Sequence, residues 1–117
     1  LNKVIKISKH SSCKGSYSGS EDIELLGRFD GTLFVKNLFI KKTGVFNGAV
    51  SAEKIFVEGV INADIETETL HLKATGIIDG DVYYRNIIIE SGGILKSQMV
   101  QNMSKINNFV ELNKKLK

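Results

Sequence analysis

The sequence predicts an all-β, single-domain parallel β-helix, or solenoid, of about five to six short coils with flexible termini. Two observations predict it. Between residues 27 and 97 a similar segment recurs, each copy beginning with a glycine, at steps of 17, 15, 17 and 17 residues. Within each copy apolar residues alternate two apart, which is the period of a strand and not of a helix. A fixed period of strand-forming segments is typical of coils that stack on one another.

The copies share the same apolar positions. Counted from the first glycine, apolar residues fall two, six, eleven and thirteen positions on, and we expect these side chains to point into the core. Each coil should contain about three short strands joined by tight corners. A lone coil buries too little apolar surface to offset the entropy of ordering its residues, so several coils must stack. The copies begin at Gly27, Gly44, Gly59, Gly76 and Gly93.

A small residue four positions into each copy marks a corner. It follows an Asp or Asn, residue types whose short side chains hydrogen-bond their own backbone and tolerate left-handed conformation. A D-G or N-G pair also suggests a two-residue hairpin. Hairpins would not repeat identical residues in register every 15 to 17 positions, whereas parallel coils do. The corner pairs are Asp30-Gly31, Asn47-Gly48, Asn62-Ala63 and Asp79-Gly80.

Residues 1–10 are expected to form an N-terminal segment ahead of the β-helix domain, which we place at 11–99. The segment includes VIKI at 4–7, an alternating stretch that predicts an edge strand covering the first coil. A second interpretation is weak contact with an anionic membrane surface. The residues of that contact would be Lys3, Val4, Ile5, Lys6 and Lys9.

The chain on either side of the regular repeats is expected to close the ends of the stack. Residues 11–26 fit a degenerate first coil with Cys13 and Tyr17 at inward positions, because terminal repeats are atypical. Cys13 is therefore predicted to be a core residue and not a reactive thiol. After Met99 the pattern stops, and the apolar spacing in 100–117 predicts either a short capping helix or a Lys/Asn-rich tail.

Charge is distributed unevenly along the chain. Residues 1–43 carry a net charge of +4, residues 44–95 of −5, and residues 96–117 of +4. The acidic middle argues against a nucleic-acid groove along the coils, so no nucleic acid is expected as a partner. No apolar run is long enough to span a bilayer, and we expect a cytoplasmic protein.

Two outer surfaces of the predicted coils carry distinctive side chains. Twelve positions into each copy, residues should stack as a mostly apolar ladder, which predicts a lateral surface for a protein partner unless flanking segments cover it. Acidic residues on neighbouring strands are spread over a convex surface, which favours a solvated acidic face over a calcium site. The ladder comprises Phe39, Phe56, His71 and Ile88, and the acidic face comprises Asp64, Glu66, Glu68, Asp79 and Asp81.

Catalytic chemistry finds little support in the sequence. His71 stands between Leu70 and Leu72, with no adjacent Ser or Cys to activate. The glycine spacings lack the lysine of a phosphate-binding loop. The apolar positions also do not recur every six residues, as they do in hexapeptide acyltransferases. We therefore expect no enzyme activity, no cofactor and no metal.

The repeated G-x-h-x-G units, where h is apolar, the D-G and N-G corners and the closing ESGGILKS resemble the bactofilin domain over about residues 4–99. The resemblance implies a right-handed parallel β-helix that polymerises end to end, without nucleotide, into filaments. Such filaments position cell-wall or polarity proteins at the inner face of the cytoplasmic membrane. In that family the last coil usually closes on G-A-x-F-x-G, with its bulky residue at the polymer interface. Here Leu95 takes the Phe position, and Ser97 replaces the final glycine.

The residues themselves also favour assembly of the chain with copies of itself. An end coil is a row of unpaired strand edges over an open core, and it templates further pairing unless it is blocked. We therefore predict a structural scaffold whose end coils dock on one another. The alternative is a non-polymerising protein-binding module that uses the apolar ladder. The predicted polymer interface comprises Ile94, Leu95 and Met99 at one end and Cys13 and Tyr17 at the other.

Overall fold

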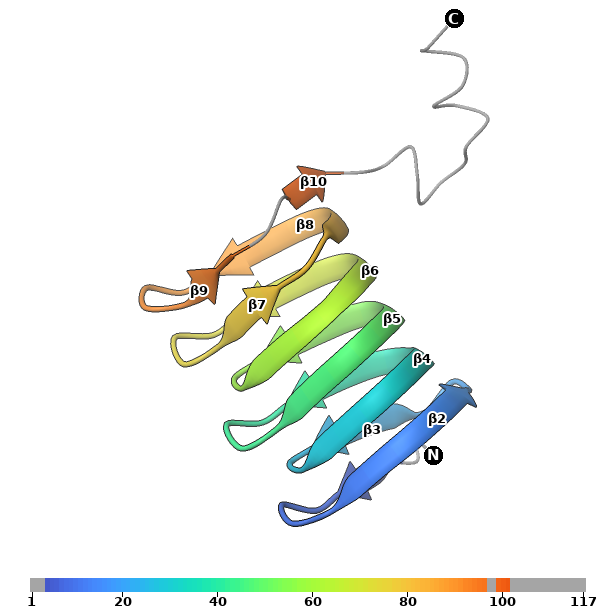
Figure 1. Ribbon diagram of the computed structural model, residues 1–117. Helices are drawn as coiled ribbons and strands as arrows, with labels where there is room; N and C mark the ends of the chain where they lie inside the picture. The colour runs from blue at the N-terminus through green and yellow to red at the C-terminus, as the bar shows by residue number, and fades with distance from the viewer. Residues whose placement is uncertain (1–3, 97–98, 102–117) are drawn as a thin grey trace, which may run out of the picture.

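The computed structural model describes residues 4–96 and the backbone of residues 99–101. Its strands form one 10-stranded sheet, and the strand pairs within it run parallel. The sheet winds into coils that stack from β2 at one end to β10 at the other (Figure 1). This arrangement confirms the predicted parallel solenoid, with about five turns.

Three long strands form the middle of the stack, and shorter strands form its two ends. Parallel pairing follows the repeat: every residue of β4 except Lys36 pairs with its equivalent in β5, and β5 pairs with β6 in the same way, except at Glu53. The strands are β1 (Val4–Ile7), β2 (Ser12–Ser18), β3 (Asp22–Leu25), β4 (Arg28–Ile40), β5 (Val45–Val57), β6 (Val60–Leu72), β7 (Ile77–Asp79), β8 (Val82–Ile89), β9 (Ile94–Leu95) and β10 (Met99–Gln101).

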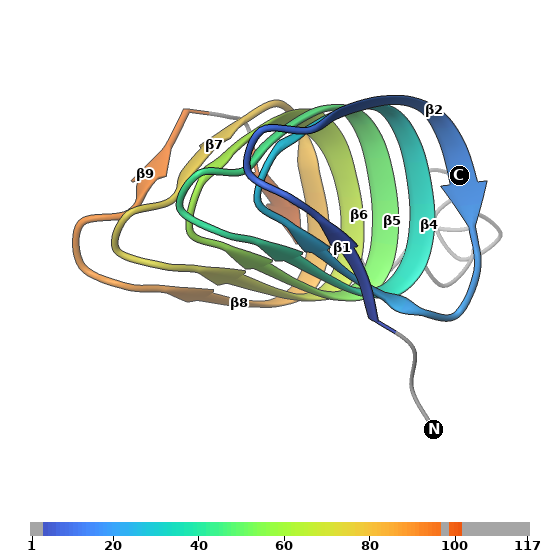
Figure 2. The ribbon, with the colours of Figure 1, turned by 90° about the horizontal axis from the view of Figure 1, so that it is seen from below.

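The central coils are each one bent strand of 13 residues, and the prediction of about three short strands per coil is wrong for them. Each long strand curves around the core when the stack is seen from below (Figure 2). Backbone pairing carries on through the corner at Gly31 and Gly48, which lie directly beside each other. The chain therefore changes direction without giving up its hydrogen bonds to the neighbouring coil.

The core consists of the predicted inward positions. Side chains eleven and thirteen residues into each central copy, such as Leu38 and Ile40, are fully buried, as is Phe46 two residues into its copy. A further inward position, eight residues into the copy, went unpredicted because it carries four unlike residues: Val35, Ala52, Thr67 and Tyr84. Thr67 is buried there and its hydroxyl lies 3.1 Å from the backbone oxygens of Glu53 and Thr69, so the polar group is satisfied.

The corners depend on glycine. Gly31 and Gly48 have φ of 141° and 132°, a conformation that L side chains rarely adopt. A Cβ built on Gly31 would lie 1.8 Å from the backbone oxygen of Gly15, and one on Gly48 would lie 1.9 Å from that of Gly31. Each corner glycine thus permits the close approach of the preceding coil. No other residue type among the described residues has a positive φ, so the expected left-handed Asp and Asn are not found.

The Asp and Asn residues before the corners instead bond to one another between coils. The Asn47 side-chain amide donates to Asp30 at 2.8 Å, and the Asn62 amide donates to the Asn47 side-chain oxygen at 3.0 Å. Arg28 adds an ion pair with Asp30 at 3.0 Å. The side chains therefore form a polar ladder along the outside of the stack, parallel to the backbone ladder.

Replacing Asp30 by asparagine is expected to reduce the amount of stability that the protein loses as the pH falls. Arg28 and then Asn47 hold the pKa of Asp30 below its ordinary value of 3.8. Such a carboxylate adds stability that is present above its pKa in the unfolded chain and is lost as the pH falls through its lower pKa in the folded chain. Urea midpoints should therefore fall less for Asp30→Asn than for the native chain between about pH 5 and pH 2.

Asp79→Asn is the matched control for this change. Asp79 occupies the same position in a later coil, and its side chain has no hydrogen bond or ion pair with the residues the structure describes. If both substitutions reduced the fall of the urea midpoint equally, the pH dependence could not be attributed to the contacts of Asp30 with Arg28 and Asn47.

The turns between coils differ in length by two residues. Four residues separate β4 from β5, whereas only Glu58 and Gly59 separate β5 from β6. The register is the same on both sides, with Val45 beside Val60 and Val57 beside Leu72. The 15-residue step in the repeat is therefore a shortened turn and not a change in the strands.

The N-terminal segment joins the sheet, as expected for an edge strand. β1 pairs with β3 in parallel, and Ile5 and Ile7 lie beside the core residues Ile23 and Leu25. Within the described residues, no helix has the length and apolar character needed to cross a membrane.

Candidate functional site

The end of the stack that contains β8 leaves part of the core uncovered. Ile89 lies in the same inward register as Leu72, Val57 and Ile40, with which it forms one column across the coils. Those three side chains are 0% exposed, whereas Ile89 is 48% exposed. The cause is the end of the repeat: β9 lies beside β7 and β10 beside β8, but no described strand lies over Asn86–Ile89.

The short strands β9 and β10 cover the rest of this end. Leu95 lies beside Ile78 and packs against the core, while Ile94 lies beside Ile77 on the outer side and is exposed. The backbone of Met99 pairs with Val82 at an inward position, and its side chain lies outside the described part. The predicted residues of this end are thus neighbours in the fold. Sequence reasoning missed Ile89 and its partner Ile87 as members of the end surface.

A signal for Ile87 and Ile89 was present in the repeat. The last copy begins at Gly93, and its recognisable pattern stops before its own positions eleven and thirteen. The preceding pair, Ile87 and Ile89, therefore has no successor in the recognisable pattern.

The opposite end is formed by β1 and β2, which lie nearest the viewer in Figure 2. Cys13 lies beside Phe29 and Tyr17 beside Leu33, and both pack partly buried against the core together with Ile5. The Tyr17 hydroxyl donates a hydrogen bond of 2.5 Å to Glu21. This bond raises the pKa of Tyr17, because deprotonation would place two negative charges side by side.

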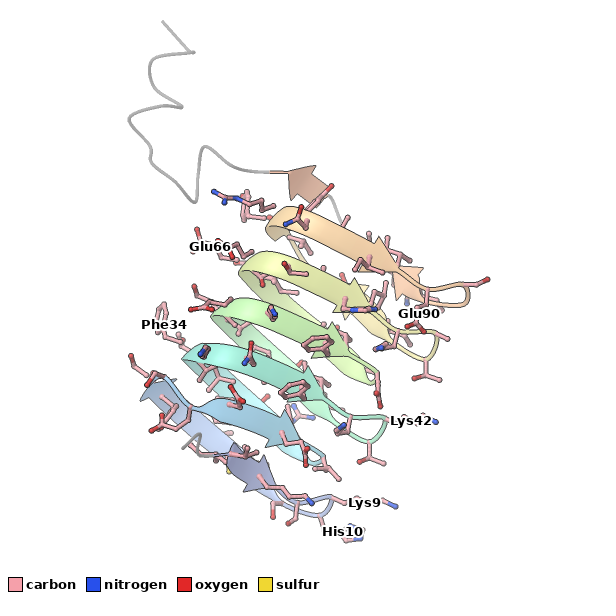
Figure 3. The ribbon with its side chains drawn as sticks, turned by 180° about the vertical axis from the view of Figure 1, so that it is seen from behind. Lys9, His10, Phe34, Lys42, Glu66 and Glu90 are labelled. Carbon is pink, nitrogen blue, oxygen red and sulfur yellow. The ribbon has the colours of Figure 1, made fainter. Side chains whose placement is uncertain are left out.

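The residues predicted for membrane contact divide between two faces. Ile5 points inward and packs against the core, so it is not available to a membrane. Val4 is 56% exposed, and Lys6 lies on the outer side, 3.7 Å from Glu24. Lys9 projects from the turn after β1 (Figure 3). Lys3 lies outside the described residues.

The predicted ladder exists as a column of stacked rings. Phe39 and Phe56 stack with ring centres 5.0 Å apart, and His71 continues the column at 5.4 Å from Phe56. Lys41 covers the Phe39 ring at 5.9 Å, and the three rings are half-buried. Ile88 extends the column and is 49% exposed. The ladder therefore stabilises the stack, and its exposed part is at Ile88.

An acidic residue borders the same column. Glu90 lies 3.3 Å from Lys73 and 3.6 Å from His71. Lys73 is the main cause that lowers the pKa of Glu90. Among the described residues, no group of three or more His, Cys, Asp or Glu side chains could hold a metal ion.

The fold and its ends define a class of protein: a parallel β-solenoid whose end strands have edges left unpaired by the other described strands. A family model named Bactofilin, described as polymer-forming cytoskeletal, matches residues 5–100. The chain therefore belongs to the bactofilin family of polymer-forming cytoskeletal proteins.

A solved structure supports the same fold. The chain is similar to the cryo-EM reconstruction of Thermus thermophilus bactofilin double helical filaments, with a TM-score of 0.74 and 18% sequence identity. The match covers 82% of this chain and 99% of that chain. A search of curated proteins finds no match.

Proposed function

We propose that this protein assembles end to end into filaments without nucleotide, and that the filaments position cell-envelope or polarity proteins in the cytoplasm. The observation that carries the assembly is Ile89, which is 48% exposed in a column where Ile40, Val57 and Leu72 are 0% exposed. The membership of the chain in a polymer-forming family supports the same conclusion.

The physical reason for assembly lies in what the ends leave unsatisfied. Covering an apolar side chain removes it from water and contributes about 1.5–3 kcal/mol when burial is complete. Several such side chains lie at each end, and the strand edges beside them supply hydrogen-bonding groups in register. The interface would comprise Ile87, Ile89, Ile94, Leu95 and Met99 at one end and Ile5, Cys13 and Tyr17 at the other.

Lys6, Lys9 and Val4 remain candidates for contact with an anionic membrane surface. Each lysine contributes about 1 kcal/mol near anionic lipid, which is weak for one subunit. A filament repeats the contact many times, so that the whole binds more strongly than each part.

Sedimentation and electron microscopy of the native chain test the proposal. The protein is expected to pellet as filaments to the same extent with and without ATP or GTP, because the interface consists of strand edges and apolar side chains. Pelleting that requires nucleotide would overturn the proposal.

The rival function is a non-polymerising module that binds a protein partner through Phe39, Phe56 and Ile88. The half-burial of both rings leaves mainly Ile88 for such a contact. Light scattering distinguishes the filament-forming protein from the binding module, because the module would remain a small particle at every concentration.

A further inference from the structure

A groove runs along one outer side of the stack, across β4, β5 and β6. The column of outward residues there reads Phe34, Ser51, Glu66 and Tyr83 in successive coils. In this column the coil of β5 contributes the small residue Ser51, with Ala49 and Ala52 near it in the lining, which leaves a hollow between the larger side chains of the neighbouring coils. The hollow has two parts with volumes of about 480 and 260 Å³.

Phe34 is the exposed apolar wall of this groove. It is 53% exposed although it lies in the middle of the stack, where no end effect accounts for its exposure. Phe34 and Glu66 project from the same side of the ribbon, one above the other (Figure 3). An aromatic side chain and a carboxylate thus flank the same hollow.

The groove is strongly acidic. Five carboxylate residues line its two parts. Arg85 pairs with one of them, Glu68, at 3.8 Å, and the other four have no ion pair within residues 4–96. A surface of this kind suits a segment with positive charges and apolar side chains. The carboxylates belong to Glu53, Asp64, Glu66, Glu68 and Asp81.

Residues 102–117 of the same chain have that composition. They contain four lysines against one acidic residue, Glu111, together with six apolar side chains. The lysines are Lys105, Lys114, Lys115 and Lys117, and the apolar residues are Met103, Ile106, Phe109, Val110, Leu112 and Leu116.

The fold places the start of this segment at the groove. β10 pairs with β8 so that Val100 lies beside Tyr83, in the same column as Phe34. From Val100 to Phe34 the column spans four strand spacings, about 19 Å. An extended chain covers about 3.3 Å per residue, so about six residues are enough to reach Phe34.

We propose that residues 102–117 dock in the groove of their own subunit, with lysines against its carboxylates and apolar side chains against Phe34. Because the segment is tethered, its effective concentration at the groove is high, and a weak contact is sufficient. The proposal concerns the side of the solenoid and does not depend on assembly at its ends.

Disulfide cross-linking tests this docking in the full chain. In a Cys13→Ser background, one cysteine is placed in the groove by Ser51→Cys and one in the segment by Asn108→Cys. The matched control replaces the groove cysteine by Lys42→Cys. Lys42 is exposed in the turn after β4 and projects on the opposite side of the stack from Phe34 (Figure 3). Two cysteines form a disulfide only when their Cα atoms approach within about 7 Å.

The Ser51–Asn108 pair is expected to cross-link within one chain about ten-fold faster than the Lys42–Asn108 pair, as for a tethered contact. Glu66→Lys, or Glu53→Lys as a second variant, should slow the reaction, as should raised salt, because both weaken charge contacts. Equal rates for the two pairs would overturn the proposal, as would a rate insensitive to charge reversal and salt.

A mixing experiment identifies the subunit that supplies the segment. Chains with only the groove cysteine are mixed with chains that have only the segment cysteine. Cross-linked pairs forming as fast as the single-chain product would show docking on another copy and would also overturn the proposal. Filament sedimentation of the same variants is read separately, so failure of the docking is distinguishable from failure of assembly.

Discussion

Arginine at position 89 is expected to abolish sedimentable filaments while leaving the subunit folded. Ile89 is 48% exposed in the subunit, so the charge of an arginine at this position stays in water and the subunit stays folded. In an end-to-end contact the same charge becomes buried without a partner, which costs about 3–5 kcal/mol. Since about 1.4 kcal/mol is a factor of ten, the end contact should weaken by two to three orders of magnitude or more. Sedimentation and electron microscopy measure the loss, and circular dichroism checks the fold.

Ile88→Arg is the matched control for this prediction. Ile88 is the next residue of the same strand and is 49% exposed, but it points outward, along the ring column. Filaments from Ile88→Arg and none from Ile89→Arg would assign assembly to the core face of the end. The opposite result would favour lateral association through the ladder. Intact filaments from both variants, and from Leu95→Arg, would rule out this end as the interface.

Alanine at position 48 is expected to destabilise the fold strongly, although it adds only one methyl group. The added Cβ would lie 1.9 Å from the backbone oxygen of Gly31, and the φ of 132° is strained for any L side chain. Backbone strain alone costs about 1–3 kcal/mol. The clash adds to it, because the two coils must separate and give up ladder hydrogen bonds of about 1 kcal/mol each. We expect a loss above about 4 kcal/mol, measured from urea unfolding of the Ile89→Arg background.

Gly15→Ala distinguishes the cost of backbone strain from the cost of the clash between coils. Gly15 has nearly the same φ, 134°, but a Cβ there meets nothing within 4 Å, since no described strand pairs with the outer edge of β2. This variant should lose only the strain contribution, about 1–3 kcal/mol. Equal losses for Gly15→Ala and Gly48→Ala would mean that coil spacing at the corner is not limiting. A Gly15→Ala chain that no longer assembles, although folded, would place that corner within the end contact.

Much of the fold follows from the repeat because parallel coils place equivalent residues side by side. The inward positions occupied by Leu38 and Ile40 could be predicted, since a strand alternates its faces and a fixed period repeats that alternation. The position of Thr67 could not, because its members, Val35, Ala52, Thr67 and Tyr84, differ in size and polarity. The same limit applied at the corners, where Asn47 bonds to a neighbouring coil. Local propensity contains no information about such a contact.

Only some residues of the candidate surfaces could be predicted from the sequence, for a related reason. Leu95 could be identified because it occupies a repeat position with a counterpart in every coil. Ile89 was missed because its exposure reflects that no described strand follows it, and a periodic pattern does not show what lies beyond its last copy. The groove at Phe34 arises from the difference between Ser51 and its neighbours. Departures from a repeat are harder to interpret than the repeat itself.

The shortened turn between β5 and β6 offers a practical route to imaging this protein in cells. Two residues are missing there relative to the turn after β4, and the pairing of Val45 with Val60 is unaffected. Turns of two and of four residues thus support the same register, and Glu58 is partly exposed in the shorter one. A fluorescent or epitope tag inserted at Glu58 would leave both solenoid ends and residues 102–117 unmodified. A fusion to either terminus, in contrast, would add its bulk beside the surfaces that we assign to assembly and docking.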